Sequence, residues 1–182
     1  MNGIHEQRPS SIAVVGSGYW GKNLVRNFNS LNALKLICDK NETILDAFKK
    51  QYAEVDVCLA FNEILNRSDI DGVVIATPAE THFRVAREAL LAGKHVYVEK
   101  PLAHNIWELR TLKKAARYYK IISQMGNQGH TTNGIRLIKE WYDAGILGKV
   151  KEVHAWHGKF NFQPGGYWTK PVSFPPPQHE IP

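Results

Sequence analysis

Residues Ser11 to Gly21 have the sequence SIAVVGSGYWG, in which an apolar run leads directly into three glycines spaced G-x-G-x-x-G. The apolar run, Ile12 to Val15, predicts a β-strand. In this pattern the first glycine permits a tight turn, the second lets a pyrophosphate approach the backbone, and the third lets the following helix pack close to the strand. The stretch therefore predicts a strand, a phosphate-binding turn and a helix, which together begin a dinucleotide-binding fold.

The turn and the start of the helix supply candidate contacts to a dinucleotide. We expect the helix to begin near Tyr19, so that its free amide groups face the pyrophosphate and the positive end of its dipole favours the anion. The candidate cofactor-binding residues of this turn are Gly16, Ser17, Gly18, Tyr19, Trp20 and Gly21.

Asp39 ends a second apolar run, LKLICD, about twenty residues after the glycine turn. An acidic residue at this place hydrogen-bonds the adenosine ribose hydroxyls, which favours NAD. Lys40 follows directly and could reach a 2′-phosphate, so NADP stays open as the alternative cofactor. A merely solvated carboxylate at Asp39 is the competing interpretation, and the glycine spacing upstream favours the nucleotide.

Helical and strand-like segments alternate after Asp39, which is typical of a parallel sheet with crossover helices. The predicted helices cover residues 43–52, 62–66, 80–91 and 105–119. The further predicted strands cover residues 55–59, 71–76, 95–99 and 121–125. With the two strands upstream, the pattern predicts an α/β fold, a Rossmann-type parallel sheet flanked by helices, over residues 1–125.

Residues 126–182 differ in kind from the part before them. They contain a predicted helix, 133–144, a long predicted strand, 149–159, and a stretch rich in proline and glycine, 163–182. We interpret them as the start of an incomplete α+β second domain with an irregular tail. A lone strand has an unpaired edge, so we expect either self-association through residues 149–159 or partial disorder after about residue 160.

The charge of the chain suits anionic small molecules more than nucleic acid. The 182 residues carry a formal net charge of +6, with basic residues spread along the sequence. The dense basic cluster consists of Lys113, Lys114, Arg117 and Lys120. Its spacing is helical and no aromatic stacking platform accompanies it, so we predict a solvated helix face and no nucleic-acid partner.

Cysteine and histidine usage gives no sign of a metal site or a disulfide framework. Cys38 and Cys58 lie in predicted buried strands, where cysteine behaves as a small hydrophobe. His154 and His157 are three residues apart on a predicted strand and would point to opposite faces. The N-terminus lacks a signal-peptide core, and no apolar run could span a membrane. We expect a cytoplasmic setting, no membrane and no metal.

Three motifs in order give the chain a family resemblance. They are the glycine turn, the strand end Ala76-Thr77-Pro78 with His82 four residues beyond the proline, and the tripeptide Glu99-Lys100-Pro101. Together they resemble the glucose-fructose oxidoreductase / inositol dehydrogenase / MocA family, written Gfo/Idh/MocA. The tripeptide is the most specific of the three, and the resemblance extends from about Ser11 to Lys159.

The resemblance implies an NAD(P)-dependent oxidoreductase. Hydride would pass between nicotinamide and a secondary hydroxyl of a sugar, nucleotide sugar or polyol. Lys100 matches the family's catalytic lysine, whose ammonium stabilises the developing alkoxide and takes part in proton transfer. The other residues carried over as cofactor-binding are Thr77, Pro78, His82, Glu99 and Asn127. His82 could equally cap a helix or face solvent.

One family motif is missing from the sequence. The family's Asp-x-x-x-His motif, whose histidine is the acid/base partner of the lysine, belongs to the substrate domain, and no Asp in this chain has a His four residues later. The alternative function is therefore a catalytically inactive NAD(H)-binding module or partner subunit. The resemblance also places Gln128 and His130 close to the active-site cleft.

Overall fold

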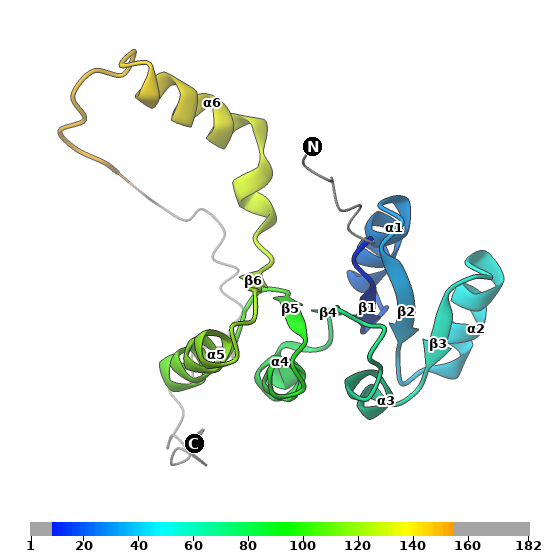
Figure 1. The fold of residues 1–182 in the computed structure, drawn as a ribbon. Coiled ribbons are helices and arrows are strands. Elements are labelled where there is room, and N and C mark those ends of the chain that lie inside the picture. Colours follow the sequence, from blue (N-terminus) through cyan, green and yellow to red (C-terminus); the bar gives the residue numbers. More distant parts are fainter. Residues whose placement is uncertain (1–8, 155–182) are drawn as a thin grey trace, which may run out of the picture. The chain divides into compact units, whose positions relative to one another are not determined.

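The computed structural model describes residues 9–154 of the chain (Figure 1). These residues divide into two compact units at the Asn127–Gln128 junction. The first unit contains a six-stranded sheet in the order β3-β2-β1-β4-β5-β6, and every neighbouring pair is parallel. The predicted Rossmann-type α/β fold is confirmed.

The elements of the first unit follow the predicted alternation. The strands are β1 (Ile12–Val15), β2 (Leu34–Cys38), β3 (Asp56–Cys58), β4 (Gly72–Ile75), β5 (His95–Val98) and β6 (Ser123–Met125). The helices are α1 (Gly21–Ser30), α2 (Glu42–Gln51), α3 (Phe61–Leu65), α4 (His82–Leu91) and α5 (Ile106–Tyr118), with a 3-10 turn η1 (Ala79–Thr81) before α4.

The central strands are apolar on both faces because helices cover both sides of the sheet (Figure 1). All four residues of β4 are buried. Val74 packs into the core under α1 and α2, whereas Val73 and Ile75 pack into the core under α3, α4 and α5. This alternation explains why a continuous apolar run, without polar positions, forms the middle of the sheet.

The observed bounds differ from the predicted ones mainly at helix starts. The first helix begins at Gly21, because Tyr19 and Trp20 belong to the turn. The segment predicted as one helix, 80–91, is a 3-10 turn followed by α4. Both changes leave more of the backbone in the loops that follow the strands.

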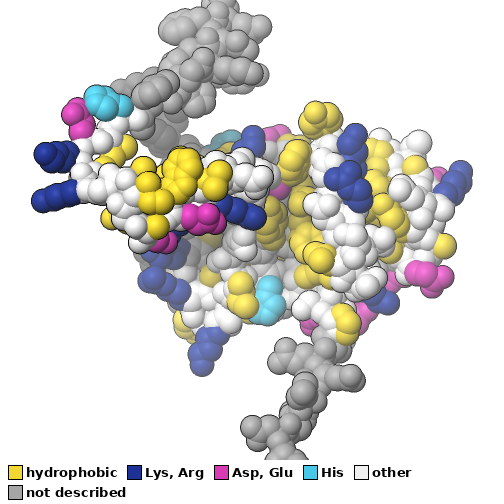
Figure 2. Space-filling view, turned by 90° about the horizontal axis from the view of Figure 1, so that it is seen from above, with side chains coloured by type: hydrophobic (Ala, Val, Ile, Leu, Met, Phe, Trp, Pro, Cys, Tyr) yellow, Lys and Arg dark blue, Asp and Glu magenta, His cyan; other side chains and the backbone are white. Residues whose placement is uncertain are grey.

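The second unit contains, within its described part, a 3-10 turn η2 (Gln128–Thr131) and helix α6 (Asn133–Asp143). Figure 2 shows hydrophobic side chains at the surface of this helix. The exposed ones are Ile135, Leu137, Ile138, Trp141 and Tyr142. No helix among residues 9–154 is long and apolar enough to cross a bilayer.

The strand predicted at 149–159 is wrong over Lys149–His154, the part of it that the structure describes, because these residues form no strand. Val153 is exposed, and the His154 imidazole contacts the Glu152 carboxylate at 2.9 Å. The described part of the second unit contains no strand that could supply ladder hydrogen bonds to this alternating pattern, and a strand needs such a partner. The remainder, 155–159, and the predicted tail, 163–182, lie outside the described residues.

Candidate functional site

The glycine turn is packed so tightly that two of its glycines are required by the protein itself. Gly16 has φ of +84°, and a Cβ there would lie 2.8 Å from the Ala76 carbonyl carbon and the Thr77 nitrogen. A Cβ on Gly21 would lie 1.9 Å from the Gly16 carbonyl oxygen. The turn therefore folds back on itself and against the end of β4, as the motif predicts.

Gly18 is different, because a Cβ on this residue would meet no atom of the described residues within 4 Å. The open space borders the start of α1. No described side chain caps this helix end, and its first turn contains no acidic residue. An open glycine beside an uncapped helix N-terminus fits a pyrophosphate in both shape and charge.

Asp39 is fixed at the end of β2 by the glycine turn. Its Oδ2 accepts hydrogen bonds from the Ser17 amide at 2.7 Å and from the Ser17 hydroxyl at 2.9 Å, and its Oδ1 accepts one from the Asn41 amide at 3.0 Å. A carboxylate has about four acceptor positions, so capacity for a ribose hydroxyl is left. Lys40, the residue predicted to serve a 2′-phosphate, is exposed beside it.

The hydrogen bonds keep Asp39 ionised. Partial burial opposes the charge, but the backbone amides of Ser17 and Asn41 and the Ser17 hydroxyl outweigh it and hold the pKa of Asp39 below its usual value. Ser17 is only 3% exposed. The sequence predicted Ser17 as a cofactor contact but not its hydrogen bonds to Asp39. The one available signal for them was that both residues belong to the same dinucleotide-binding motif.

His82 joins two loops at the carboxyl edge of the sheet. Its ring is 1% exposed, with Nε2 at 2.8 Å from the Thr77 carbonyl oxygen and Nδ1 at 2.7 Å from the Pro101 carbonyl oxygen. The side chain neither faces solvent nor caps α4. Contact with a nicotinamide ribose stays a prediction, and both ring nitrogens already have protein neighbours.

The loop after β4 is ordered further by its own hydroxyls. The Thr81 hydroxyl donates to the Pro78 carbonyl oxygen at 2.7 Å and lies 2.7 Å from the Thr77 hydroxyl. Thr77 is half-buried and Pro78 is exposed. Thr77 and Pro78, the predicted nicotinamide-side residues, thus lie on a loop that is held by hydrogen bonds of the Thr81 hydroxyl and by the contact of the His82 ring with the Thr77 carbonyl oxygen.

Lys100 follows β5 at the same edge. Its side chain is exposed, and the Lys100–Pro101 peptide bond is cis. Directly before it, the Glu99 amide donates to the Ile75 carbonyl oxygen at 2.9 Å, which extends the β4–β5 ladder by one residue. His82 then fixes the Pro101 side of the loop, so both neighbours of Lys100 are held by the scaffold.

Glu99 is 6% exposed and lies against residues that sequence reasoning missed. The Tyr97 hydroxyl lies 3.4 Å from its Oε1. Burial, then the Glu99 charge and this hydrogen bond, raise the pKa of Tyr97. A Cβ on Gly126 would lie 2.5 Å from the Tyr97 hydroxyl and 2.8 Å from Glu99 Oε1, so a larger residue there would displace these two side chains. The next residue, Asn127, is exposed at the end of the first unit.

The same ladder extension recurs along the whole edge. The first residue after each of five strands donates its amide to the last carbonyl of a neighbouring strand. The donor and acceptor pairs are Gly16–Cys38, Asp39–Cys58, Ala76–Val15, Glu99–Ile75 and Gly126–Val98. The loops that carry the candidate residues therefore start from one continuous frame, as binding loops of open α/β sheets do.

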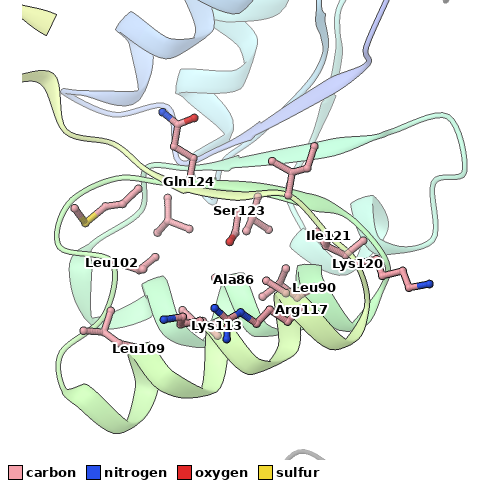
Figure 3. Close-up of a pocket in the computed structure, with 16 residues that line it drawn as sticks. Ala86, Leu90, Leu102, Leu109, Lys113, Arg117, Lys120, Ile121, Ser123 and Gln124 are labelled. Atoms are coloured by element: carbon pink, nitrogen blue, oxygen red, sulfur yellow. The ribbon is translucent and has the colours of Figure 1, made fainter. Parts of the chain in front are cut away.

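Two predicted neighbours of the site, Gln128 and His130, belong to the second unit. A groove of about 720 Å³ between α4, α5, β5 and β6 contains none of the predicted cofactor residues (Figure 3). Leu90, Leu102 and Leu109 contribute to its apolar lining, and Lys113 and Arg117 to its rim. Residues 9–154 contain no cluster of three His, Cys, Asp or Glu suited to a metal ion.

Comparisons with known proteins place this geometry among oxidoreductases. The model of an oxidoreductase family with an NAD-binding Rossmann fold matches residues 10–127. The structure of scyllo-inositol dehydrogenase from Lactobacillus casei with bound NAD(H) and scyllo-inositol superposes with a TM-score of 0.71 at 26% identity, over 78% of this chain and 43% of that one.

Two curated relatives carry other names. A glycosyl hydrolase family 109 protein from Shewanella sp. (strain ANA-3) is 35% identical over 116 residues, covering 58% of this chain and 25% of the relative. A 2,7-anhydro-N-acetylneuraminate hydratase from Mediterraneibacter gnavus is 26% identical, covering 87% of this chain and 42% of the relative. The chain thus spans less than half the length of these relatives.

Proposed function

The chain belongs to the Gfo/Idh/MocA oxidoreductase family, and from this premise we propose that its first unit binds NAD along the carboxyl edge of the sheet. The observation that carries the proposal is the open position at Gly18 beside an Asp39 carboxylate fixed by Ser17. The pyrophosphate would occupy the space over Gly18 and the start of α1. Asp39 would accept the adenosine ribose hydroxyls.

NAD rather than NADP is proposed because of the charge on Asp39. Asp39, whose pKa lies below the ordinary value of 3.8, is ionised near neutral pH, and an ionised carboxylate repels a 2′-phosphate. Lys40 is adjacent and exposed, which reduces that repulsion without removing it. We expect NADH to bind more tightly than NADPH by about tenfold, the size of one unfavourable charged contact.

The proposed reaction is hydride transfer to or from a secondary hydroxyl of a sugar, nucleotide sugar or polyol. Support comes from the family and from the relative whose structure contains NAD(H) and scyllo-inositol. Bound NAD supplies the hydride acceptor. Lys100 would hold the substrate hydroxyl and stabilise the alkoxide that develops as the proton leaves. His82 would position Lys100 through the Pro101 carbonyl.

A second candidate is hydrolysis of a glycoside, favoured by the 35% identical relative named a glycosyl hydrolase family 109 protein. Dehydrogenation and glycoside hydrolysis differ in the product that accumulates. A dehydrogenase converts NAD to NADH in step with substrate, whereas a hydrolase releases a sugar with no net change in cofactor. The third candidate, an NAD(H)-binding module without turnover, would show neither product.

Binding is tested first by titrating the full chain with NADH and NADPH and following cofactor fluorescence. Gly18→Leu should weaken NADH binding by about tenfold or more, since the added side chain would start in the open space proposed for the pyrophosphate, where a Cβ meets no described atom within 4 Å. Gly134→Leu is the matched control, because a Cβ on this residue of α6 also meets no described atom within 4 Å. Equal affinities in both variants, or no binding of either cofactor at millimolar concentration, would contradict the proposal.

Turnover is tested with NAD and a panel of polyols, sugars and nucleotide sugars. Absorbance of the reduced cofactor reports dehydrogenation, and release of the aglycone from aryl glycosides reports hydrolysis. Reduced cofactor supports the oxidoreductase, free aglycone at constant cofactor supports the hydrolase, and binding without either product supports the inactive module.

A further inference from the structure

Cys38 and Cys58 are direct neighbours on the parallel strands β2 and β3. They are paired in register, and both side chains lie in the same core cluster, so they point to one face of the sheet. Both are free thiols, 3% and 7% exposed. Neighbouring strands lie about 4.8 Å apart, within the Cα separation of about 4.4 to 6.8 Å that a disulfide spans.

The two thiols are chemically unequal. The Cys58 thiol donates to the Ala60 carbonyl oxygen at 3.7 Å, and the neighbouring Cys38 side chain lowers the pKa of the Cys58 thiol. The Cys58 side chain, together with burial, raises the pKa of Cys38. The Cys58 thiol thus has the lower pKa of the two, which assigns the attack on an oxidant to Cys58 and the resolving step to its neighbour Cys38.

The pair is also part of the frame that holds the glycine turn and Asp39. The Gly16 amide donates to the Cys38 carbonyl oxygen at 2.8 Å, and the Asp39 amide donates to the Cys58 carbonyl oxygen at 3.2 Å. Asp39 follows Cys38 directly in the chain. Any movement of the two cysteine backbones is thus passed to both parts of the proposed adenosine site.

We propose that Cys38 and Cys58 form a redox modification site, in which a peroxide converts the two thiols to a disulfide and thereby weakens dinucleotide binding. The effect on binding rests on the proposed function, whereas the disulfide itself does not. A disulfide draws the two Cβ atoms to about 3.8 Å and fixes their torsion. Closing the Cβ atoms to that distance would draw the carboxyl ends of β2 and β3 together, and Asp39 and the Cys38 carbonyl that accepts from Gly16 would move with them.

The chemistry balances with hydrogen peroxide as the oxidant. The Cys58 thiol releases its proton, the thiolate attacks one peroxide oxygen, the O–O bond breaks, and the hydroxide that leaves takes up the released proton, so the products are a sulfenic acid at Cys58 and one water. The Cys38 sulfur then attacks the Cys58 sulfur, the S–S bond forms, the S–O bond breaks, and a second water leaves. Two thiols lose two electrons and two protons, and the peroxide is reduced to two waters.

The test uses the reduced full chain treated with an equimolar amount of hydrogen peroxide. Intact mass should fall by about 2 Da, the loss of two hydrogens, and a thiol reagent should restore it. NADH affinity should fall by about tenfold or more and recover with reduction, since charged hydrogen bonds of Asp39 are displaced. In Cys58→Ala and Cys58→Ser, peroxide should leave the affinity unchanged. If one of these two variants does not fold, the other still tests the prediction.

Hydrogen exchange at the Ser17 amide separates this proposal from the proposed function. The amide is bound to Asp39, so the disulfide should speed its exchange whether or not NADH is present. A gain in mass without a disulfide, an unreactive pair, or a disulfide that changes neither Ser17 exchange nor NADH affinity would overturn the proposal. If the reduced chain binds no NADH while Ser17 exchange responds to peroxide, the proposed function fails and the redox coupling stands.

Discussion

The two halves of the carboxyl edge differ in how completely the protein builds them. On the β1–β2 side, Ser17 ties the glycine turn to Asp39 with hydrogen bonds of 2.7 and 2.9 Å, and the backbone is packed too closely at Gly16 and Gly21 to admit a Cβ. On the β4–β5 side, the loop backbones are held by His82, but Lys100 is exposed. The difference teaches that contacts within the first unit fix the proposed adenosine end of the site, whereas at the proposed nicotinamide end they fix the loop backbones and leave the Lys100 side chain exposed.

Among the changes that test this comparison, Gly21→Ala should have the largest effect on stability. The new methyl would lie 1.9 Å from the Gly16 carbonyl oxygen, which is backbone and cannot swing away. We expect a loss of about 4 kcal/mol or more in the free energy of unfolding, measured by urea denaturation. Gly134→Ala adds the same methyl with no described atom within 4 Å and should cost nothing. Similar losses in the two variants would mean that the turn is not close-packed.

His82→Ala should have the next largest effect, because it leaves two loop carbonyls without their imidazole neighbour and creates a cavity. We expect a loss of about 3 kcal/mol in unfolding free energy. His104→Ala, at an exposed histidine, serves as the control and should change stability little. If stability were unaffected in both variants, the two loops would not depend on His82.

Asp39→Asn should act on binding. The variant keeps the size of the side chain and loses the charge, so NADH affinity should fall by roughly tenfold to a hundredfold, while NADPH affinity falls less. Fluorescence titration gives both values. Asp46→Asn changes an exposed acid on α2 and should alter neither. A uniform loss for NADH and NADPH would argue against a ribose contact at Asp39.

Asp39 also predicts a pH dependence of stability. Its pKa in the folded chain is lower than the ordinary value of 3.8. Its ionised hydrogen bonds therefore stabilise the fold above that value, and the contribution is lost as the pH falls through the lower folded pKa. In urea unfolding at about pH 7 and about pH 3, the stability difference between wild type and Asp39→Asn should shrink at the lower pH. If the stability difference were larger at about pH 3 than at about pH 7, the pKa of Asp39 would be raised on folding and the prediction would be wrong.

Lys100→Met should have the smallest effect on the fold. The side chain is exposed, so stability should change by about 0.5 kcal/mol or less and NADH affinity should stay nearly constant, while any turnover falls by about a hundredfold or more. Lys94→Met is the contrasting lysine, because its buried ammonium donates to the Arg67 and Ile70 carbonyl oxygens. Equal destabilisation by the two changes would show that Lys100 is part of the scaffold.

The sequence predicted those features that depend on local pattern. Apolar runs and glycines revealed the six strands and the turn, since burial on both faces and a positive φ leave direct marks on composition. The places of Gly21 at the start of the first helix and of Asp39 at the end of β2 could be predicted from the spacing of the motif alone. The three motifs together, of which Glu99-Lys100-Pro101 is the most specific, predicted the family that the family model confirms.

The features that sequence reasoning missed arise from contacts between distant residues. The His82 contacts with Thr77 and Pro101, and the close approach of Gly126 to Tyr97, require knowing which strands are neighbours. The strand predicted over residues 149–159 is wrong over Lys149–His154 for the opposite reason. An alternating pattern is a local mark, but a strand exists only with a hydrogen-bonding partner.

The amide ladder beyond the strand ends has a consequence for how such a site can diverge. Because the first residue after each of five strands is fixed to its neighbour, an insertion or deletion at that residue would put the whole loop out of register. Length changes are accommodated only further along each loop, where the backbone is released. We therefore expect substrate preference to change through the tips of these loops and through side chains. The residue that directly follows each of the five strands should be neither inserted nor deleted.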